Sequence, residues 1–428
     1  MTVTNENKQI FSWALYDWAN SAFAVTIMTG FFPIFFKSYL ADGLSANEST
    51  YQLGLANSIA SLVIVVLAPL LGSVADQAGR KKSFLFLFTF LGVVMCAALF
   101  LVKAGQWQLA MMIYILSVIG FSGGVTFSDS LLVHIARRDR LDTVSALGYA
   151  LGYLGGGVLF AACVWLTQQP QLFGLDNAVA AIQVSFLLVA FWWALFSLPV
   201  FLYVTEPLPA RRIVSTINPL VAGWKQLCQT FSEIRQLRMV MIFLMAYWLY
   251  IDGVDTIVRM AVDYGLSLNL DSSDLIKALL LTQFISFPSS LLFGLIGKYI
   301  GVKQGIYTGL LIYVFVVLWA WQMEQAWEFY WLAALIGLVQ GGVQSLSRSL
   351  YARLIPQRRS AEFFGFYNML GKFAAVLGPM MIGVVTLLSG SHRQGMLSIL
   401  ILFISGAMLL FFVDIKKGQK LAEQLNET

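Results

Sequence analysis

The chain has 428 residues, of which 59% are hydrophobic and 11% are charged, and its formal net charge is +5. Soluble domains contain about 45–50% apolar and about 25% charged residues, so a soluble fold of this length could not bury so much apolar surface. The composition fits a protein dissolved in a bilayer, and we expect the positive charge to set topology and not to bind nucleic acid.

Twelve segments are long enough to span a bilayer, which takes about 20 mostly apolar residues. The first six lie near 11–39, 51–75, 83–103, 107–135, 143–168 and 178–204. The second six lie near 239–264, 274–297, 303–323, 327–352, 361–389 and 394–414. The polar N-terminus has no small-residue cleavage site, so we expect the first segment to be a retained span and not a signal peptide.

Positive residues gather in alternate loops. Of the 27 Lys and Arg, 20 lie on the side of the two termini, four lie on the other side and three lie inside spans. The positive-inside rule therefore places both termini in the cytoplasm, which an even number of spans also requires.

The longest loop, 205–238, separates a first half, 1–204, from a second half, 239–428. Its apolar residues recur at helical spacing, which indicates an amphipathic helix on the membrane surface or a plain tether. A shift of 219 residues lays Asp129 on Arg348 and Gly152 on Gly371. We predict an all-α membrane protein with twelve transmembrane helices in two pseudo-symmetric six-helix bundles.

The loop after the second span reads Gly72-Ser-Val-Ala-Asp76-Gln-Ala-Gly79-Arg80-Lys81-Lys82. It resembles the G-x-x-x-D-x-x-G-R-[RK] signature of the major facilitator superfamily. The resemblance implies a gating role for Gly72, Asp76, Gly79 and Arg80. The chain departs from the signature at Gln77, where many members carry Arg or Lys, which could weaken one ion pair of the motif.

A closer resemblance is to the vacuolar-effluxer-like (autophagy-related permease) family, which has many bacterial members. It rests on YDWANSAF at 16–23, SALGYALGYLGG at 145–156, YIDGVDTI at 250–257 and QGGVQSLSRSL at 340–350. It implies a multi-pass, alternating-access transporter of the bacterial cytoplasmic (inner) membrane. The vacuolar members are associated with amino-acid efflux.

Ionisable side chains inside spans are costly and mark candidate sites. In the first half these are Asp17, which shares a helix face with Asn20, and Asp129. A carboxylate in a cavity of low dielectric takes up a proton more readily, which suits proton coupling. The alternative is a structural cap or a hydrogen bond between helices.

The seventh span carries Asp252, Asp255 and Arg259 on one face. Asp255 and Arg259 are four residues apart and can neutralise each other, the interpretation that we favour for this pair. Asp252 lies about 20 Å along its span, near the middle of the membrane, where we expect a functional role.

Two further cations lie inside spans of the second half. Lys372 lies about 18 Å into the eleventh span, where it could bind a substrate carboxylate or pair with an aspartate. Arg348 could pair with Asp129 across the two halves or form a plain structural ion pair. Four uncharged hydrogen-bonding side chains, which could line a cavity or join helices, are Gln283, Gln340, Gln344 and Asn368.

Charges of both signs suit a zwitterion, so we predict a proton-coupled secondary transporter of a small solute, such as an amino acid. A transporter of lipids or lipophilic drugs is the alternative. The sequence carries no nucleophile elbow, zinc-ligand spacing or Walker loop, so we expect no enzyme activity, metal or cofactor. The expected partners of the monomer are the substrate, a proton and membrane lipids.

Overall fold

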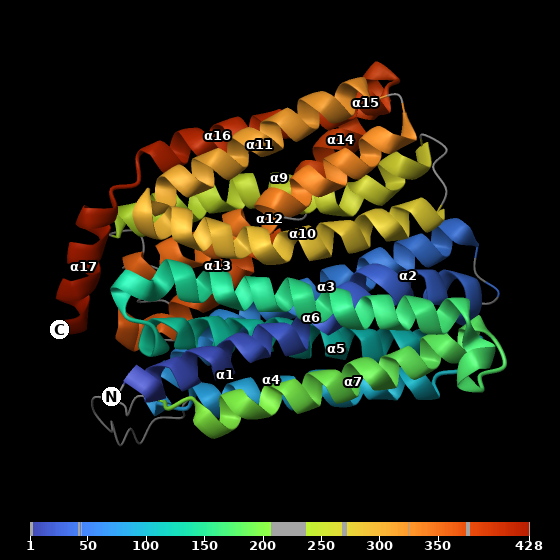
Figure 1. Cartoon of the computed structure of the whole chain (residues 1–428), viewed down its shortest axis with the longest axis horizontal. Coiled ribbons are helices and arrows are strands. Elements are labelled where there is room, and N and C mark those ends of the chain that lie inside the picture. Colours follow the sequence, from blue (N-terminus) through green and yellow to red (C-terminus); the bar gives the residue numbers. More distant parts are fainter. Residues whose placement is uncertain are drawn as a thin grey trace.

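The computed structural model describes residues 3–41, 43, 45–206, 237–267, 272–323, 325–373 and 377–427. Every regular element in these ranges is a helix (Figure 1). Most of the predicted linker helix within 205–238 lies outside the described residues. The domain limits drawn at 204 and 239 remain predictions.

The first half contains six spans in chain order. They are α1 (Val3–Ala22) continued by η1 (Phe23–Phe31), α2 (Phe32–Phe35) and η2 (Phe36–Leu40), then α3 (Ala46–Ala78), α4 (Lys81–Ala98) with η3 (Leu99–Leu101), α5 (Trp107–Ile135), α6 (Leu141–Gln168) and α7 (Ala178–Tyr203). Short 3-10 turns, η4 (Arg138–Arg140) and η5 (Pro170–Phe173), precede and follow α6.

The second half repeats this arrangement. Its helices are α9 (Arg238–Ser267), α10 (Ser272–Tyr299), α11 (Val302–Gln322), α12 (Ala326–Leu354), α13 (Ser360–Phe373), α14 (Leu377–Ser389), α15 (His392–Leu397) and α16 (Ile399–Phe411). A turn, η6 (Gln357–Arg359), precedes α13, and a final helix, α17 (Ile415–Glu427), follows the last span. In the described residues twelve helical segments are long and apolar enough to cross a membrane, as the sequence predicted.

The predicted repeat is visible in the helix bounds. Helix α5 covers Trp107–Ile135 and α12 covers Ala326–Leu354, so the two helices are related by the same shift of 219 residues. The α5 and α12 positions therefore correspond one to one, which confirms two pseudo-symmetric halves.

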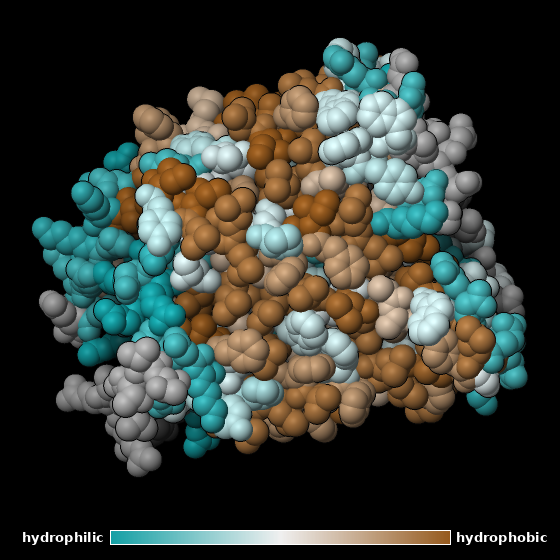
Figure 2. Space-filling view, in the orientation of Figure 1, coloured by the Kyte–Doolittle hydropathy of each residue, from teal (hydrophilic) through white to brown (hydrophobic). Residues whose placement is uncertain are grey.

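The outer surface is apolar around the middle of the molecule and polar at both ends (Figure 2). Large apolar side chains stand exposed on this band, among them Leu62, Phe191 and Leu311. In a bilayer these side chains would face lipid, and the helices satisfy their backbone groups internally. Both termini lie at one end of the bundle, which we call the terminus face (Figure 1).

The two halves meet along two seams. Helix α3 packs against α13, and α6 packs against α10 and α12. Glycines allow the closest approaches, because a Cβ atom at Gly72 would overlap the backbone of Ala361 and one at Gly365 would overlap the backbone of Pro69. Small residues at such crossings are how helices pack closely in membranes.

The turn between α3 and α4 explains one glycine of the loop signature. Gly79 ends α3 with φ 60° and ψ 42°, in the left-handed region. Glycine adopts this conformation without the steric cost that a side chain brings. The signature residue Gly79 therefore allows the turn between α3 and α4, and Gly72 allows the close approach of α3 to α13.

We expect Gly120→Ala to destabilise the protein by about 1–3 kcal/mol, because overpacking forces neighbours apart. A Cβ at Gly120 would lie 2.8 Å from the carbonyl oxygen of Phe88 and would also overlap the backbone of Gly92. Thermal unfolding in detergent, followed by tryptophan fluorescence, measures the change. The control is Gly383→Ala, where a Cβ meets no atom within 4 Å. Equal stability of both variants would contradict the packing argument.

Candidate functional site

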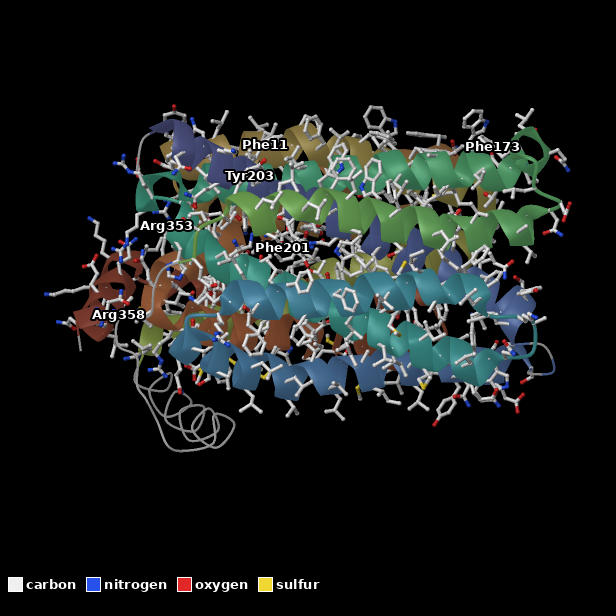
Figure 3. All side chains as sticks on the ribbon, turned by 90° about the horizontal axis from the view of Figure 1, so that it is seen from below. Phe11, Phe173, Phe201, Tyr203, Arg353 and Arg358 are labelled. Atoms are coloured by element: carbon white, nitrogen blue, oxygen red, sulfur yellow. The ribbon has the colours of Figure 1, made fainter. Side chains whose placement is uncertain are left out.

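A cavity of about 440 Å³ lies between the two halves. Eight of the residues proposed from the sequence line it, namely Asp17, Asn20, Asp255, Gln283, Gln340, Gln344, Arg348 and Lys372. Its lining follows α12 from Arg348 to Phe329, roughly 28 Å along the helix. Because α12 ends beside the terminus face, the cavity extends from the middle of the bundle toward the opposite end. Figure 3 shows Arg353 at the terminus face and Phe173 at that opposite end.

The floor of the cavity is a buried ion-pair network around Arg348. Its Nη1 donates to Asp129 Oδ1 at 2.8 Å and to Asp17 Oδ2 at 3.1 Å. Its Nε donates to Ser145 Oγ at 3.0 Å, and its Nη2 donates to the Ser145 carbonyl at 2.9 Å. The network joins α1, α5 and α6 of the first half to α12 of the second. The structure thus shows the Asp129–Arg348 contact considered above and adds Asp17 to it.

Aromatic rings and a glycine enclose the guanidinium. The Arg348 Cζ atom lies 4.8 Å from the ring centroid of Trp13 and 4.3 Å from that of Tyr149, within the range of cation–π attraction. A Cβ at Gly148 would lie 2.8 Å from Arg348 Nη2 and would overlap Asp17 Oδ2. Only glycine therefore leaves room for the Asp17–Arg348 contact, which accounts for Gly148 in the SALGYALGYLGG segment.

A polar seam between α6 and α12 closes the cavity toward the terminus face. Asp142 accepts hydrogen bonds from Ser349 Oγ at 2.7 Å and from Arg353 Nη2 at 2.7 Å. Further from the terminus face, Tyr153 OH donates to Gln344 Oε1 at 2.8 Å. Each contact joins one half to the other.

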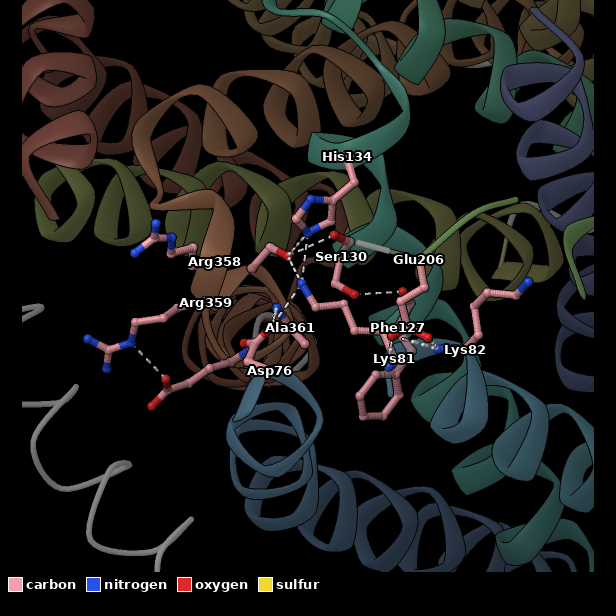
Figure 4. Close-up of polar contacts among 12 residues, drawn as sticks. Asp76, Lys81, Lys82, Phe127, Ser130, His134, Glu206, Arg358, Arg359 and Ala361 are labelled. Carbon is pink, nitrogen blue, oxygen red and sulfur yellow. Dashed lines mark hydrogen bonds and ion pairs between the residues drawn. The ribbon is translucent and has the colours of Figure 1, made fainter. Parts of the chain in front are cut away.

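The loop signature closes the second seam. Asp76 accepts hydrogen bonds from the backbone N–H groups of Ala361 at 3.2 Å and Glu362 at 2.8 Å. These N–H groups lie in the first turn of α13, where a helix favours negative charge. Lys81 Nζ lies 2.8 Å from Asp76 Oδ1, and both side chains are buried (Figure 4). A carboxylate of the first half thus caps a helix of the second.

Lys81 holds two further partners in this seam. Its Nζ donates to Ser360 Oγ at 2.7 Å and lies 2.8 Å from His134 Nε2 (Figure 4). An ammonium group has no acceptor capacity, so His134 Nε2 must be the acceptor. The backbone N–H of Lys81 donates to Glu206, and burial raises the pKa of the Glu206 carboxyl.

Several signature and span residues differ from their predicted roles. Arg80, predicted to act in gating, is exposed, and the next residue, Lys81, supplies the buried cation. Asp252 is fully buried but does not line the cavity. Its carboxylate accepts from the N–H groups of Leu377 at 3.1 Å and Gly378 at 3.0 Å, so it caps the start of α14.

The remaining candidates divide between cavity and packing. Lys372 lines the cavity, with Nζ 5.8 Å from the ring centroid of Phe121. Asn368 instead donates to Asp129 Oδ2 at 3.4 Å and lies outside the cavity lining. The side chain of Arg259 lies outside the described residues, so its predicted pairing with Asp255 is not described.

Sequence reasoning missed the aromatic lining and the seam partners. Tyr149 and Tyr153 line the cavity from the glycine-rich segment of α6, four residues apart and on one helix face. The spacing of the two tyrosines could have predicted that they share one face of the helix. No local sequence pattern predicts the contact between His134 and Ser360, because the two residues are 226 positions apart.

Comparison with known proteins identifies relatives over nearly the whole chain. The sequence model described as "Vacuole effluxer Atg22 like" matches residues 49–423. The uncharacterized MFS-type transporter YxiO of Bacillus subtilis is 39% identical over 422 residues, which are 98% of each chain. Autophagy-related protein 22 of Yarrowia lipolytica is 26% identical over 342 residues, 72% of this chain and 56% of that protein.

Solved structures show a related fold. The human organic anion transporter MFSD10 (TETRAN) superposes with a TM-score of 0.74 at 16% identity, covering 95% of this chain and 99% of that one. The major facilitator superfamily transporter FucP in the outward conformation superposes with a TM-score of 0.70 at 12% identity, covering 96% and 99%.

We expect Arg348→Met to cost about 3–5 kcal/mol of unfolding free energy, because it leaves Asp17 and Asp129 buried without their cation. The triple variant Asp17→Asn, Asp129→Asn, Arg348→Met should recover much of the loss, since no buried charge then remains in the network. Thermal unfolding in detergent compares the two variants. A triple variant less stable than Arg348→Met would refute the electrostatic account.

Proposed function

Because the chain belongs to the Atg22-like vacuole effluxer family and has the major facilitator fold, we propose that it is a proton-coupled secondary transporter of a small zwitterion, such as an amino acid. The observation that carries this proposal is a cavity between the halves whose lining holds Asp255 and Lys372, charges of opposite sign. The ammonium group of a zwitterion would face Asp255, and its carboxylate would face Lys372.

The two seams support a transport cycle of alternating access. With the seams formed, the cavity is closed toward the terminus face by the Asp76 cap on α13 and the Asp142–Arg353 ion pair. Rocking of one half against the other would break these contacts and form others on the opposite side. We propose that the terminus face is cytoplasmic and that the membrane is the bacterial inner membrane.

Proton coupling is assigned to the Arg348 network. Arg348 holds Asp17 at 3.1 Å and Asp129 at 2.8 Å, and Asp17 also lines the cavity. Protonation of Asp17 would remove one of the two charges that hold Arg348. Because Arg348 belongs to the other half, the proton would weaken a contact between the halves, and that links its uptake to their movement.

A second candidate function has one observation in its favour. The cavity lining beyond the polar floor is largely apolar, with Val25, Met28, Phe160, Val316 and Phe329 among its members. Such a lining also suits a lipid or a lipophilic drug.

Charge movement in proteoliposomes separates the two functions. The reconstituted protein is challenged on a solid-supported membrane with pooled amino acids, then with lipids and drugs, with and without a pH gradient. A pH-dependent current with an amino-acid pool supports the zwitterion. Silence there together with a response to lipid or drug overturns it in favour of the lipophilic substrate.

We expect Asp17→Asn to abolish flux driven by a pH gradient, because an amide cannot exchange the proton. The folded state should persist, since Arg348 keeps Asp129. Proton-driven flux is measured in proteoliposomes, and size-exclusion chromatography checks folding. The control is Asp139→Asn, which changes an exposed carboxylate outside the cavity. Unchanged proton-driven flux in Asp17→Asn would rule out this carboxylate as the coupling group.

We expect Lys372→Met to lower the affinity for amino acids by about tenfold or more, the loss for one hydrogen bond to a charged group. Substrate KM is measured from initial uptake rates. Lys37→Met, which removes an exposed lysine that does not line the cavity, should leave KM unchanged. A normal KM in Lys372→Met would mean that this ammonium does not bind substrate.

A further inference from the structure

Two glutamines on neighbouring helices line the cavity and carry buried oxygens that lack a protein partner among the described residues. Gln283 of α10 and Gln340 of α12 both line it. The Oε1 atom of each is buried and accepts no hydrogen bond from any described residue. The two helices pack together at this level, because Ser286 Oγ donates to the Gly337 carbonyl at 3.0 Å. Ser286 and Gly337 are each three residues from a glutamine, so both amides belong to one wall.

Buried oxygens without a hydrogen-bond partner destabilise the folded state. A buried acceptor without a partner costs about 1–3 kcal/mol, and folded proteins seldom retain one without a reason. Gln344, one turn along α12, shows the ordinary solution, because its Oε1 accepts from Tyr153 OH at 2.8 Å. Gln344 therefore joins two helices, whereas the oxygens of Gln283 and Gln340 have no partner among the described residues.

The cation of the site lies on a different wall. Lys372 is on α13 and packs over Phe121 of α5. Helix α13 contacts α3 and α5, whereas α10 contacts α6 and α12, and Gln283 faces Gly157 of α6. The cavity therefore has an ammonium group on the α5–α13 wall and two carboxamide side chains on the α10–α12 wall.

We propose that the carboxamides of Gln283 and Gln340 turn their oxygens into the cavity, where they accept hydrogen bonds from the ammonium group of the substrate while Lys372 binds its carboxylate. The inference rests on the proposed transport of a zwitterion and narrows it to compounds whose nitrogen carries N–H donors. Asp255 lines the same cavity and contributes the negative charge that favours an ammonium. A quaternary ammonium has the charge but no N–H to donate, so the site discriminates against it.

The test is uptake of a ¹⁴C-labelled mixture of L-amino acids into proteoliposomes. Gln283→Met and Gln340→Met remove the amide at nearly constant volume and should each raise KM about tenfold, with kcat largely retained. Gln283→Glu and Gln340→Glu keep an acceptor and should retain affinity. The matched control is Gln183→Met, because the Gln183 amide donates to the Val102 carbonyl at 3.2 Å and lies outside the cavity.

A competition experiment addresses the chemistry of the substrate nitrogen. The unlabelled mixture should compete with the label, whereas the same mixture after exhaustive methylation of its amino groups should compete at least about tenfold less well. The difference should shrink in the Gln283→Met, Gln340→Met double variant.

The outcomes separate the two proposals. Wild-type protein that takes up no amino acid overturns the proposed function and this inference with it. Wild-type protein that transports, with unchanged KM in the methionine variants or equal competition by the methylated mixture, overturns only the role of the glutamines. Size-exclusion chromatography identifies misfolded variants, and loss of affinity in both glutamate variants would also contradict the acceptor role.

Discussion

An arginine buried in an apolar medium must take every charge and acceptor it needs from protein. Arg348 does so with two carboxylates, a serine hydroxyl and a backbone carbonyl. Because a guanidinium is rigid and planar, these groups have to come to it from fixed directions. The positions of α1, α5 and α6 against α12 follow from that demand, and so does the polar floor of the cavity.

The repeat gives this pairing a geometric origin. Asp129 and Arg348 occupy the same position in α5 and α12, and their side chains meet at 2.8 Å. Identical residues there would have placed like charges in contact, which disfavours both. The two halves must therefore differ at this position, and opposite charges turn a point of repulsion into the contact that joins them.

Much of the fold could be predicted from the sequence, because span length, hydropathy and loop charge are local properties. The twelve spans and the repeat follow from them, whereas the Asp129–Arg348 contact was one of two alternatives for Arg348. The seam partners could not be predicted in this way. Whether Arg80 or Lys81 reaches Asp76 depends on the direction in which the first turn of α4 leaves Gly79. Asp252 was expected to have a functional role because its depth in the membrane can be estimated from the sequence, whereas the side of α9 that meets α14 cannot.

The absence of a side chain at Gly148 makes the Arg348 network sensitive to very small changes. A methyl group there would act as a wedge between Asp17 and Arg348, and it would do so only while the two are in contact. A substitution that destabilises one conformation and leaves the other unchanged shifts the free-energy difference between the two by the full amount of the destabilisation. Gly148 is therefore a position at which one added carbon could hold the protein in the arrangement where the floor has opened, and so make that arrangement accessible to structure determination.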